Sequence, residues 1–525
     1  MPKGRGIIRT LLVIFSCCDV LCSLQCAEKS RLEVERPLDA ARLIADRIKD
    51  TQTQAQALAA VGVKYAELGD YKRSLDALDS IDNGGFFSSE PASGYPPAWY
   101  QTRAWGEVAL LLAQGKQQLR AQELLARALQ KAKTIRNPHT QANALCQVVR
   151  NTAKAGEVDQ AIEIARGITD TFFQPMALVE IADGLQGRQK FDRLLNTVDS
   201  ISSPYSKTRT LILLAEQVIQ RKQTDQAVGL LDRAYETTLQ LKESSTDSDL
   251  LAKLAFQYAL AGKKDRAQEI FAQSLSKAES IRDRPGKSME MSQLAILSAQ
   301  AGDFKMASGI AGRMEPGDDQ DRALIEVARS LAQAGRQAEA RSITRQIQAQ
   351  GRKDAAIAEI VAVHTERRQF HPAQQLAATI DNEFERSKAL QQIAFEYGET
   401  REFRQALKIA LGIPDARTQF YTLQKIALSM NRAGRSELAL ETAQMIKDSS
   451  YRARTLVSIA GQHAEAGASI KAAEIIDLAL KEIALIQDQS DRADLLAEVS
   501  IPWMRANIES NAERKLILNK LAGSK

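Results

Sequence analysis

Small residues recur along this chain at a nearly constant distance, and that spacing constrains the fold more than any other feature. Each mark stands about five residues after a turn, and all but the leucine are small: Ala41, Ser74, Ala121, Ala161, Leu194, Ala227, Ala267, Ala307, Ala340, Ala373, Ala406, Ala439 and Ala472. Of the twelve gaps between them, eight are 33 residues, three are 40 and one is 47. Self-similarity at such a period is typical of an array of stacked repeats.

Each period has the pattern of two short amphipathic helices around a turn. In residues 322–347, Leu324, Val327 and Leu331 recur at helical spacing, Gly335 marks the turn, and Ile343 belongs to a second apolar stripe. Such a hairpin buries one seam and needs neighbours to cover its other faces. The sequence therefore predicts an all-α fold, a right-handed α–α superhelix (solenoid) of about 12–13 helical hairpins with a 33-residue repeat.

The 40-residue gaps are predicted to hold longer second helices. Seven extra residues make about two helical turns, which lengthens a helix with little rotation of its apolar face. An insertion in a loop would not need to match a whole number of helical turns. Long second helices are expected at residues 121–135, 227–241, 267–281 and 472–486.

Three segments carry a family resemblance: 293–307, 61–74 and 254–267. Each has a large apolar residue followed by a small one, a glycine seven residues later, and a small residue five further on. This pattern resembles the tetratricopeptide repeat (TPR), over roughly residues 38–515, although the short units carry Ile or Met where the family has a small residue in the second helix. The resemblance implies a TPR-like α-solenoid, placed here at residues 38–521, and it is unspecific about function.

The array is predicted to open with half a hairpin. The segment 39–50 matches the second half of a unit, because Ala41, Ala45 and Ile48 keep the offsets of Ala161, Ala165 and Ile168. We expect this helix to act as an end cap of the solenoid.

The joints between short units repeat an acidic residue followed by an arginine. The pairs are Asp448 with Arg452, Asp488 with Arg492, and Asp381 with Arg386. We interpret the aspartate as a helix cap or charge partner and the arginine as reaching a neighbouring unit. A repeated ligand contact is the alternative.

The first 27 residues have the pattern of an export signal. Lys3, Arg5 and Arg9 form a basic start, and residues 10–24 are mostly apolar and too short to span a membrane as a helix. The sequence predicts a signal peptide at 1–27, a charged linker at 28–37, and a bacterial protein that is periplasmic or extracellular, with no transmembrane helix in the mature chain. A weak lipoprotein box offers lipid anchoring at Cys17, and a buried first helix in a cytosolic chain is the other alternative.

Cysteine usage and charge exclude several classes of protein. Only Cys146 lies outside the N-terminal segment, so the sequence predicts neither a disulfide framework nor a cysteine metal cage. The net charge is +5, with basic and acidic residues interleaved. No nucleic-acid footprint is therefore expected.

An aromatic insertion at residues 82–100 interrupts the array. It is rich in Gly, Ser and Pro and is predicted to be an irregular loop. It carries five aromatic residues: Phe86, Phe87, Tyr95, Trp99 and Tyr100. The aromatics either tuck the loop onto neighbouring helices or form an exposed recognition loop.

The residues of catalytic and cofactor sites do not form recognisable motifs. The four histidines are spread over different units or separated by a turn, and no phosphate-binding glycine loop or nucleophile motif occurs. We therefore expect no enzyme activity, no cofactor and no metal.

The resemblance implies a partner groove lined by the first helices. Its basic candidates are Arg150, Arg329, Lys425 and Arg454, and they do not repeat the Lys/Asn pattern of the known carboxylate clamp, so no clamp is carried over. The sequence predicts a non-catalytic scaffold or adaptor that binds a protein or peptide. The alternatives are a carbohydrate- or envelope-binding module that uses the aromatic loop, and a cytosolic regulator.

Overall fold

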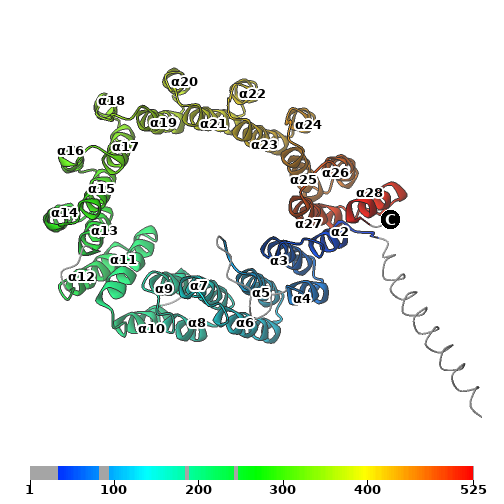
Figure 1. Cartoon of the computed structure of the whole chain (residues 1–525), viewed down its shortest axis with the longest axis horizontal. Helices are drawn as coiled ribbons and strands as arrows, with labels where there is room; N and C mark the ends of the chain where they lie inside the picture. Colours follow the sequence, from blue (N-terminus) through cyan, green and yellow to red (C-terminus); the bar gives the residue numbers. More distant parts are fainter. Residues whose placement is uncertain (1–33, 82–93, 184–187, 242–245, 524–525) are drawn as a thin grey trace, which may run out of the picture. The chain divides into compact units, whose positions relative to one another are not determined.

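The computed structural model describes residues 34–81, 94–183, 188–241 and 246–523, and every regular element in these ranges is an α-helix (Figure 1). The prediction of an all-α solenoid is confirmed. The predicted signal segment 1–27 and residues 28–33 of the linker lie outside the described residues. Within the described ranges, no helix combines the length and the apolar character that crossing a bilayer requires.

The described helices alternate along the chain between the first and the second helix of a hairpin. The first helices are α3 (Thr51–Glu67), α5 (Pro97–Gln114), α7 (Pro138–Lys154), α9 (Phe173–Asp183), α11 (Pro204–Gln220), α13 (Thr246–Leu260), α15 (Arg284–Gln300), α17 (Asp318–Gln333), α19 (Gln350–Glu366), α21 (Glu383–Glu399), α23 (Ala416–Arg432), α25 (Ser449–Glu465) and α27 (Gln489–Arg505). The second helices are α4 (Tyr71–Asp79), α6 (Gln118–Lys133), α8 (Val158–Arg166), α10 (Arg188–Asp199), α12 (Thr224–Thr238), α14 (Lys264–Ser280), α16 (Phe304–Arg313), α18 (Gln337–Thr344), α20 (Phe370–Ala377), α22 (Phe403–Leu411), α24 (Ser436–Gln444) and α26 (Ser469–Ile483). Two helices stand outside this alternation, α2 (Pro37–Ala45) and α28 (Ala512–Ala522).

The chain forms two compact units, and each is described by itself. Unit 2 comprises residues 92–446, and unit 1 combines residues 1–91 with residues 447–525. In unit 2 the first helices from α13 to α23 lie side by side in one row on the inner side of its curve, and the second helices stand outside them (Figure 1). Each hairpin of unit 2 thus packs on its neighbours along the chain, as a solenoid requires.

The regularly spaced small residues are buried where the helices pack against one another. All thirteen marks are at most 2% exposed, and Ala340, Ala373 and Ala406 are each 0% exposed. A short side chain at these places lets two helices approach closely, and a larger one would have to displace packed neighbours. The equivalent burial of these alanines confirms that the sequence period reports one repeated packing environment.

The longer gaps do lengthen the second helices. The helices α6, α12, α14 and α26 contain 15–17 residues. Most of the other second helices, α4, α8, α16, α18, α20, α22 and α24, contain 8–10. The predicted location of the extra turns is confirmed, although these helices start three residues earlier and end one to three residues earlier than expected.

Most hairpin turns need one residue in the left-handed backbone region. Gly335 has φ +82° there, and Gly69, Gly262 and Gly302 have similar values. Glycine adopts this region without the steric cost of a β-carbon. At Lys222 and Lys116 a lysine holds the same conformation, both with φ +60°, so the glycine pattern alone does not reveal every turn.

The joints between units use the capping pattern expected from sequence, with one correction. The Asp448 side chain accepts the backbone N–H of Tyr451 at 2.9 Å, as a helix cap does. At the joint before α21, Asn382 caps the helix through the N–H of Glu385, so the assignment of the capping role to Asp381 was wrong. Asparagine is as good an N-cap as aspartate and stands at the required position directly before the helix.

Two arginines of these joints, Arg386 and Arg492, reach the preceding unit, as predicted. Arg386 donates to the carbonyl of Ile380 at 3.1 Å, and Arg492 donates to that of Ile486. These carbonyls follow the end of the preceding second helix, where helical partners are missing. Arg452 pairs with Glu482 on α26, the second helix of its own hairpin, at 2.6 Å.

The first and the last of the described helices, α2 and α28, pack on one another within unit 1. α2 lies along α27 in the place of a second helix, and α27 also packs against α3. α28 holds the N-terminal segment, because Val34 N–H donates to Asn519 Oδ1 at 3.1 Å and Lys515 Nζ lies 2.6 Å from a Glu35 carboxylate oxygen. The opening half hairpin is therefore real, but the interpretation of α2 as an end cap was wrong, because α27 packs against it. It also begins at Pro37, inside the predicted linker.

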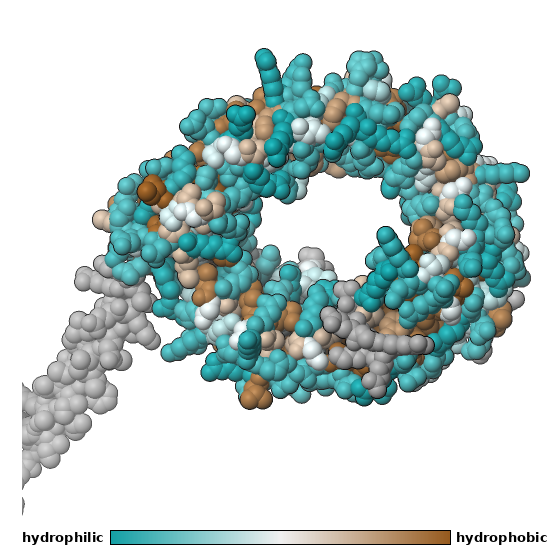
Figure 2. All heavy atoms as spheres, turned by 180° about the vertical axis from the view of Figure 1, so that it is seen from behind, coloured by the Kyte–Doolittle hydropathy of each residue, from teal (hydrophilic) through white to brown (hydrophobic). Residues whose placement is uncertain are grey.

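The visible surface is mostly polar. Figure 2 shows hydrophilic side chains over most of one face, with separate apolar spots between them. Scattered exposed apolar residues of this kind are normal for a folded protein.

Candidate functional site

The described part of the aromatic insertion is more helical than predicted. α5 begins at Pro97, so Trp99 and Tyr100 belong to its first turn rather than to an irregular loop. Proline at the first helical position favours that start because its missing N–H has no helical partner to lose. Phe86 and Phe87 lie outside the described residues.

The described aromatics pack on one another. The rings of Tyr95 and Trp99 stack at 4.0 Å between centroids, and Tyr100 meets Trp99 edge-on at 5.2 Å. Trp99 is only 8% exposed, and its indole N–H donates to Asn143 Oδ1 at 2.8 Å. Trp99 thus anchors the segment to α7, and of the stacked pair only Tyr95, at 37% exposed, offers much ring surface to a partner. Stacking of a sugar on Trp99 would require Tyr95 to move.

Two of the predicted groove cations are neutralised by the neighbouring repeat. Arg150 on α7 donates from Nε to Glu180 on α9 at 2.8 Å. Arg329 on α17 lies 3.4 Å from Glu326 on its own helix and 3.9 Å from Glu359 on α19. Because these carboxylates already accept the charge, both arginines connect adjacent first helices.

The second of these contacts belongs to a longer ladder of polar pairs along unit 2. Gln300 on α15 donates to Glu326 at 3.0 Å, and Lys388 on α21 donates to Glu359 at 3.0 Å. Together with Arg329 these residues connect α15, α17, α19 and α21. Partly exposed pairs of this kind each contribute little stability, and they leave the row with little free charge.

Lys425 on α23 differs from those arginines. It is exposed and forms no ion pair within the described ranges; its ammonium lies 5.3 Å from the ring centroid of Tyr421. Tyr421 is 38% exposed and meets Phe395 of α21 edge-on at 6.0 Å. An aromatic pair beside an unpaired cation is the type of surface that protein partners use. The sequence indicated Lys425 but not the two aromatics, which become neighbours only through the packing of α21 on α23.

Arg454, the fourth cation, lies in unit 1 and is also paired. It reaches from α25 to Glu498 on α27. Burial raises the pKa of the Glu498 carboxyl, and burial also raises the pKa of nearby Asp494 to about 6. The four predicted cations therefore do not form one site: three lie in unit 2 and one in unit 1.

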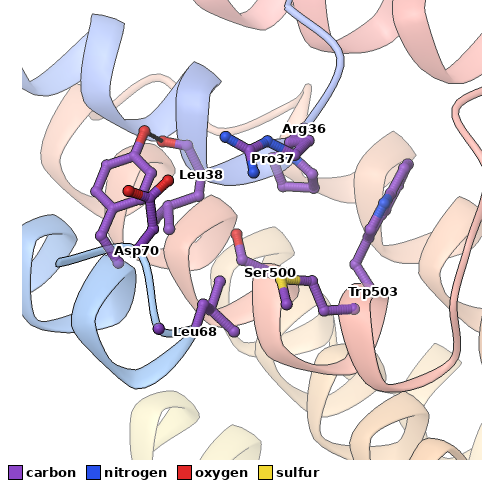
Figure 3. Close-up of a pocket in the computed structure, with 10 residues that line it drawn as sticks. Arg36, Pro37, Leu38, Leu68, Asp70, Ser500 and Trp503 are labelled. Atoms are coloured by element: carbon purple, nitrogen blue, oxygen red, sulfur yellow. Dashed lines mark hydrogen bonds between the residues drawn. The ribbon is translucent and has the colours of Figure 1, made fainter. Parts of the chain in front are cut away.

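A pocket of about 370 Å³ lies within unit 1 (Figure 3). It is lined by Arg36, Pro37, Leu38, Tyr65, Leu68, Gly69, Asp70, Ser500, Trp503 and Met504. These residues come from the start of α2, the end of α3 with the following turn, and the last turns of α27. The pocket exists because the two ends of the chain pack together, so no short-range pattern in the sequence could have indicated it.

The polar groups of the pocket are connected to one another. Arg36 donates to Asp39 from Nε at 2.9 Å and from Nη2 at 3.2 Å. The Tyr65 hydroxyl donates to Asp39 Oδ1 at 2.7 Å. Burial, together with this carboxylate, raises the pKa of the Tyr65 phenol far above its usual value, so Tyr65 remains a donor.

The described residues offer little conventional chemistry elsewhere. None of their groups of His, Cys, Asp and Glu has three or more members placed to hold a metal ion. Cys146 is 4% exposed, and burial raises the pKa of its thiol to about 11, which keeps it protonated at neutral pH.

The comparisons with known proteins are distant. No family model matches the chain, and no curated protein is similar to it. Among solved structures, Ypp1 is 12% identical over 94% of this chain and 84% of that chain, with a TM-score of 0.35. Ton1535 from Thermococcus onnurineus NA1 is 18% identical over 73% and 93%, with a TM-score of 0.22. A human IFIT1 dimer with PPP-AAAA is 14% identical over 78% and 93%, with a TM-score of 0.26. At these identities and scores the likenesses carry no functional argument, and the chain is described by its own repeats as a TPR-like α-solenoid.

Proposed function

We propose that this chain is a non-catalytic scaffold that binds a protein or peptide along the first helices of unit 2, and that it does so after export to the bacterial envelope or periplasm. The single observation that carries the binding role is the surface formed by Lys425, Tyr421 and Phe395, which we call the α21–α23 patch. Its cation is unpaired and its aromatic rings are partly open.

The contrast with the rest of the row supports this location. Arg329 and Lys388 stand on the same row of helices, and both have carboxylate partners within 4 Å. A partner that approached them would have to break an existing ion pair. At Lys425 a partner carboxylate would gain a charge-assisted contact without that cost.

The N-terminal sequence supports the proposed location in the cell. A basic start and a short apolar stretch precede the repeats, as in exported proteins. Sequencing the N-terminus of the mature protein tests this part. A start near residue 28 is expected, and an intact Met1 in the cytosolic fraction would contradict it.

Cross-linking in intact cells followed by mass spectrometry tests the binding role. We expect cross-links between one partner protein and residues of the α21–α23 patch. In the Tyr421→Ala, Lys425→Glu double variant the yield of these cross-links should fall at least about fivefold, because an anchor ring and an attractive charge are both lost.

A matched control distinguishes this loss from a general effect of charge. Lys408 is exposed on α22, in the outer row of the same unit, and Lys408→Glu makes the same charge change away from the patch. It should leave the cross-links unchanged. If the wild type and the double variant retained a partner equally, the binding surface would not be the α21–α23 patch. Turnover of a substrate by the purified chain would contradict the scaffold role.

A further inference from the structure

The unit 1 pocket has no part in the proposed scaffold function, yet it has the properties of a ligand site. Its volume of about 370 Å³ falls within the range of small-molecule pockets, roughly 300–1,000 Å³. Figure 3 shows Arg36, Leu68, Ser500 and Trp503 arranged around the same space.

One part of the lining is apolar. It consists of Pro37, Leu38, Leu68, Trp503 and Met504. Trp503 is 5% exposed and Leu38 is 2% exposed, so both are fixed by packing, whereas Met504 is 46% exposed at the surface. A rigid indole beside a flexible thioether accepts large apolar side chains of differing shape.

The other part of the lining carries one cation and one anion. Arg36 uses Nε and Nη2 to bind Asp39, and its Nη1 makes no hydrogen bond to a described residue. Asp70 accepts the backbone N–H of Arg73 at 3.1 Å, and its second oxygen lies 3.4 Å from the Arg73 guanidinium. A carboxylate has about four acceptor positions, so Asp70 can take a further donor.

We propose that this pocket binds a free α-amino acid with a large apolar side chain. The ligand carboxylate bonds to Nη1 of Arg36, its ammonium group donates to Asp70, and its side chain lies between Trp503, Leu68 and Met504. The charges support this class of ligand, because a lining with one positive and one negative group matches a zwitterion of no net charge better than an anion or a cation.

Binding of this ligand would also tie the two ends of the chain together. Arg36 directly precedes α2, Asp70 directly precedes α4 and Trp503 lies on α27, so a bound amino acid contacts both segments of unit 1. Because such a ligand binds only the folded unit, it raises the melting temperature of unit 1 as its concentration increases.

Isothermal titration calorimetry on the full chain tests the proposal with three probes: L-phenylalanine, L-phenylalaninamide, which lacks the carboxylate, and N-acetyl-L-phenylalanine, which lacks the ammonium group. We expect saturable binding of L-phenylalanine and affinities at least about tenfold lower for both derivatives. Arg36→Gln should weaken L-phenylalanine about tenfold and leave L-phenylalaninamide unchanged. Asp70→Asn should weaken L-phenylalanine and leave the N-acetyl derivative unchanged.

Two control variants match these changes outside the pocket. Arg42→Gln removes an arginine of α2 that pairs with Asp46, and Asp50→Asn alters the N-cap of α3 as Asp70→Asn alters that of α4. Asparagine remains a good cap, so these variants should fold. Absence of saturable L-phenylalanine binding, equal binding of the three probes, or equal losses in the control variants would each overturn the proposal.

Discussion

Replacing Glu290 by glutamine should stabilise unit 2 at high pH and not at low pH. Glu290 lies on α15, is 7% exposed, and its Oε2 has no hydrogen-bond partner among the described residues. Burial and, to a smaller extent, Asp249 on α13 raise the pKa of this carboxyl to about 7, while Lys253 and a hydrogen bond with Ser248 oppose the change. Lys253 is already paired with Asp249 at 2.6 Å, which limits its help to Glu290.

The direction of the pH effect on the free energy of unfolding depends on whether the folded or the unfolded chain binds the proton of Glu290. Between about pH 4.5 and pH 7 the folded chain keeps the Glu290 proton while the unfolded chain releases it, so the free energy of unfolding falls as pH rises through this window and is level above it. A shift from 4.5 to about 7 corresponds to at most about 3 kcal/mol, at roughly 1.4 kcal/mol for each pH unit. Glutamine cannot ionise and avoids this loss.

Hydrogen exchange of α13 and α15, followed by mass spectrometry across this pH range, measures the effect helix by helix. Local measurement suits a repeat array, because a single global transition is not assured. After correction for intrinsic exchange, Glu290→Gln should increase protection above pH 7, by up to about 3 kcal/mol, and change it little below pH 4.5. Glu441→Gln makes the same change at an exposed residue of α24 and should have no effect. An equal gain at both ends of the pH range, or greater protection of the wild type above pH 7, would refute the reasoning.

Three further changes test the packing and the joints. Ala373→Leu should lower the stability of unit 2 by about 1–3 kcal/mol because residue 373 is 0% exposed, and a thermal melt that matches the wild type would show that the site has room. Asp415→Ala removes the side chain that accepts the Thr418 N–H at 2.7 Å and should cost about 1 kcal/mol in urea unfolding, with Asp415→Asn as the tolerated control. Lys222→Gly should stabilise its turn by about 1 kcal/mol because φ is +60° there, a gain that would be absent if the lysine backbone were unstrained.

The fold was predictable because the repeats share one pattern of apolar and small residues. Ala340 and Ala373 stand 33 residues apart and are equally buried, so local periodicity was sufficient to locate both. Helix lengths followed from the same spacing, as α14 with its 17 residues shows. The boundaries were less certain, since α5 begins at Pro97 inside the expected loop, where a proline at the first helical position outweighs the loop composition around it.

The candidate site was predictable only in part. Lys425 and Arg329 looked alike in sequence, as cations on first helices, yet one is open and the other is paired. The difference comes from Glu359 on the adjacent helix α19, whose position relative to Arg329 depends on how the repeats stack. Sequence spacing places residues on a face, but it does not say which charges of neighbouring repeats meet.

The sequence by itself determined the helical hairpin, its period and the burial of the regularly spaced small residues. These features depend on contacts within a repeat and between repeats that are adjacent in the chain. Only the tertiary structure decided that α2 completes a hairpin with α27 and that a pocket forms beside them. Val34 and Asn519 are separated by 485 positions, yet they form a hydrogen bond within unit 1. The local spacing of small residues indicates contacts between repeats that are adjacent in the chain, and it does not indicate which helices distant in the chain pack together.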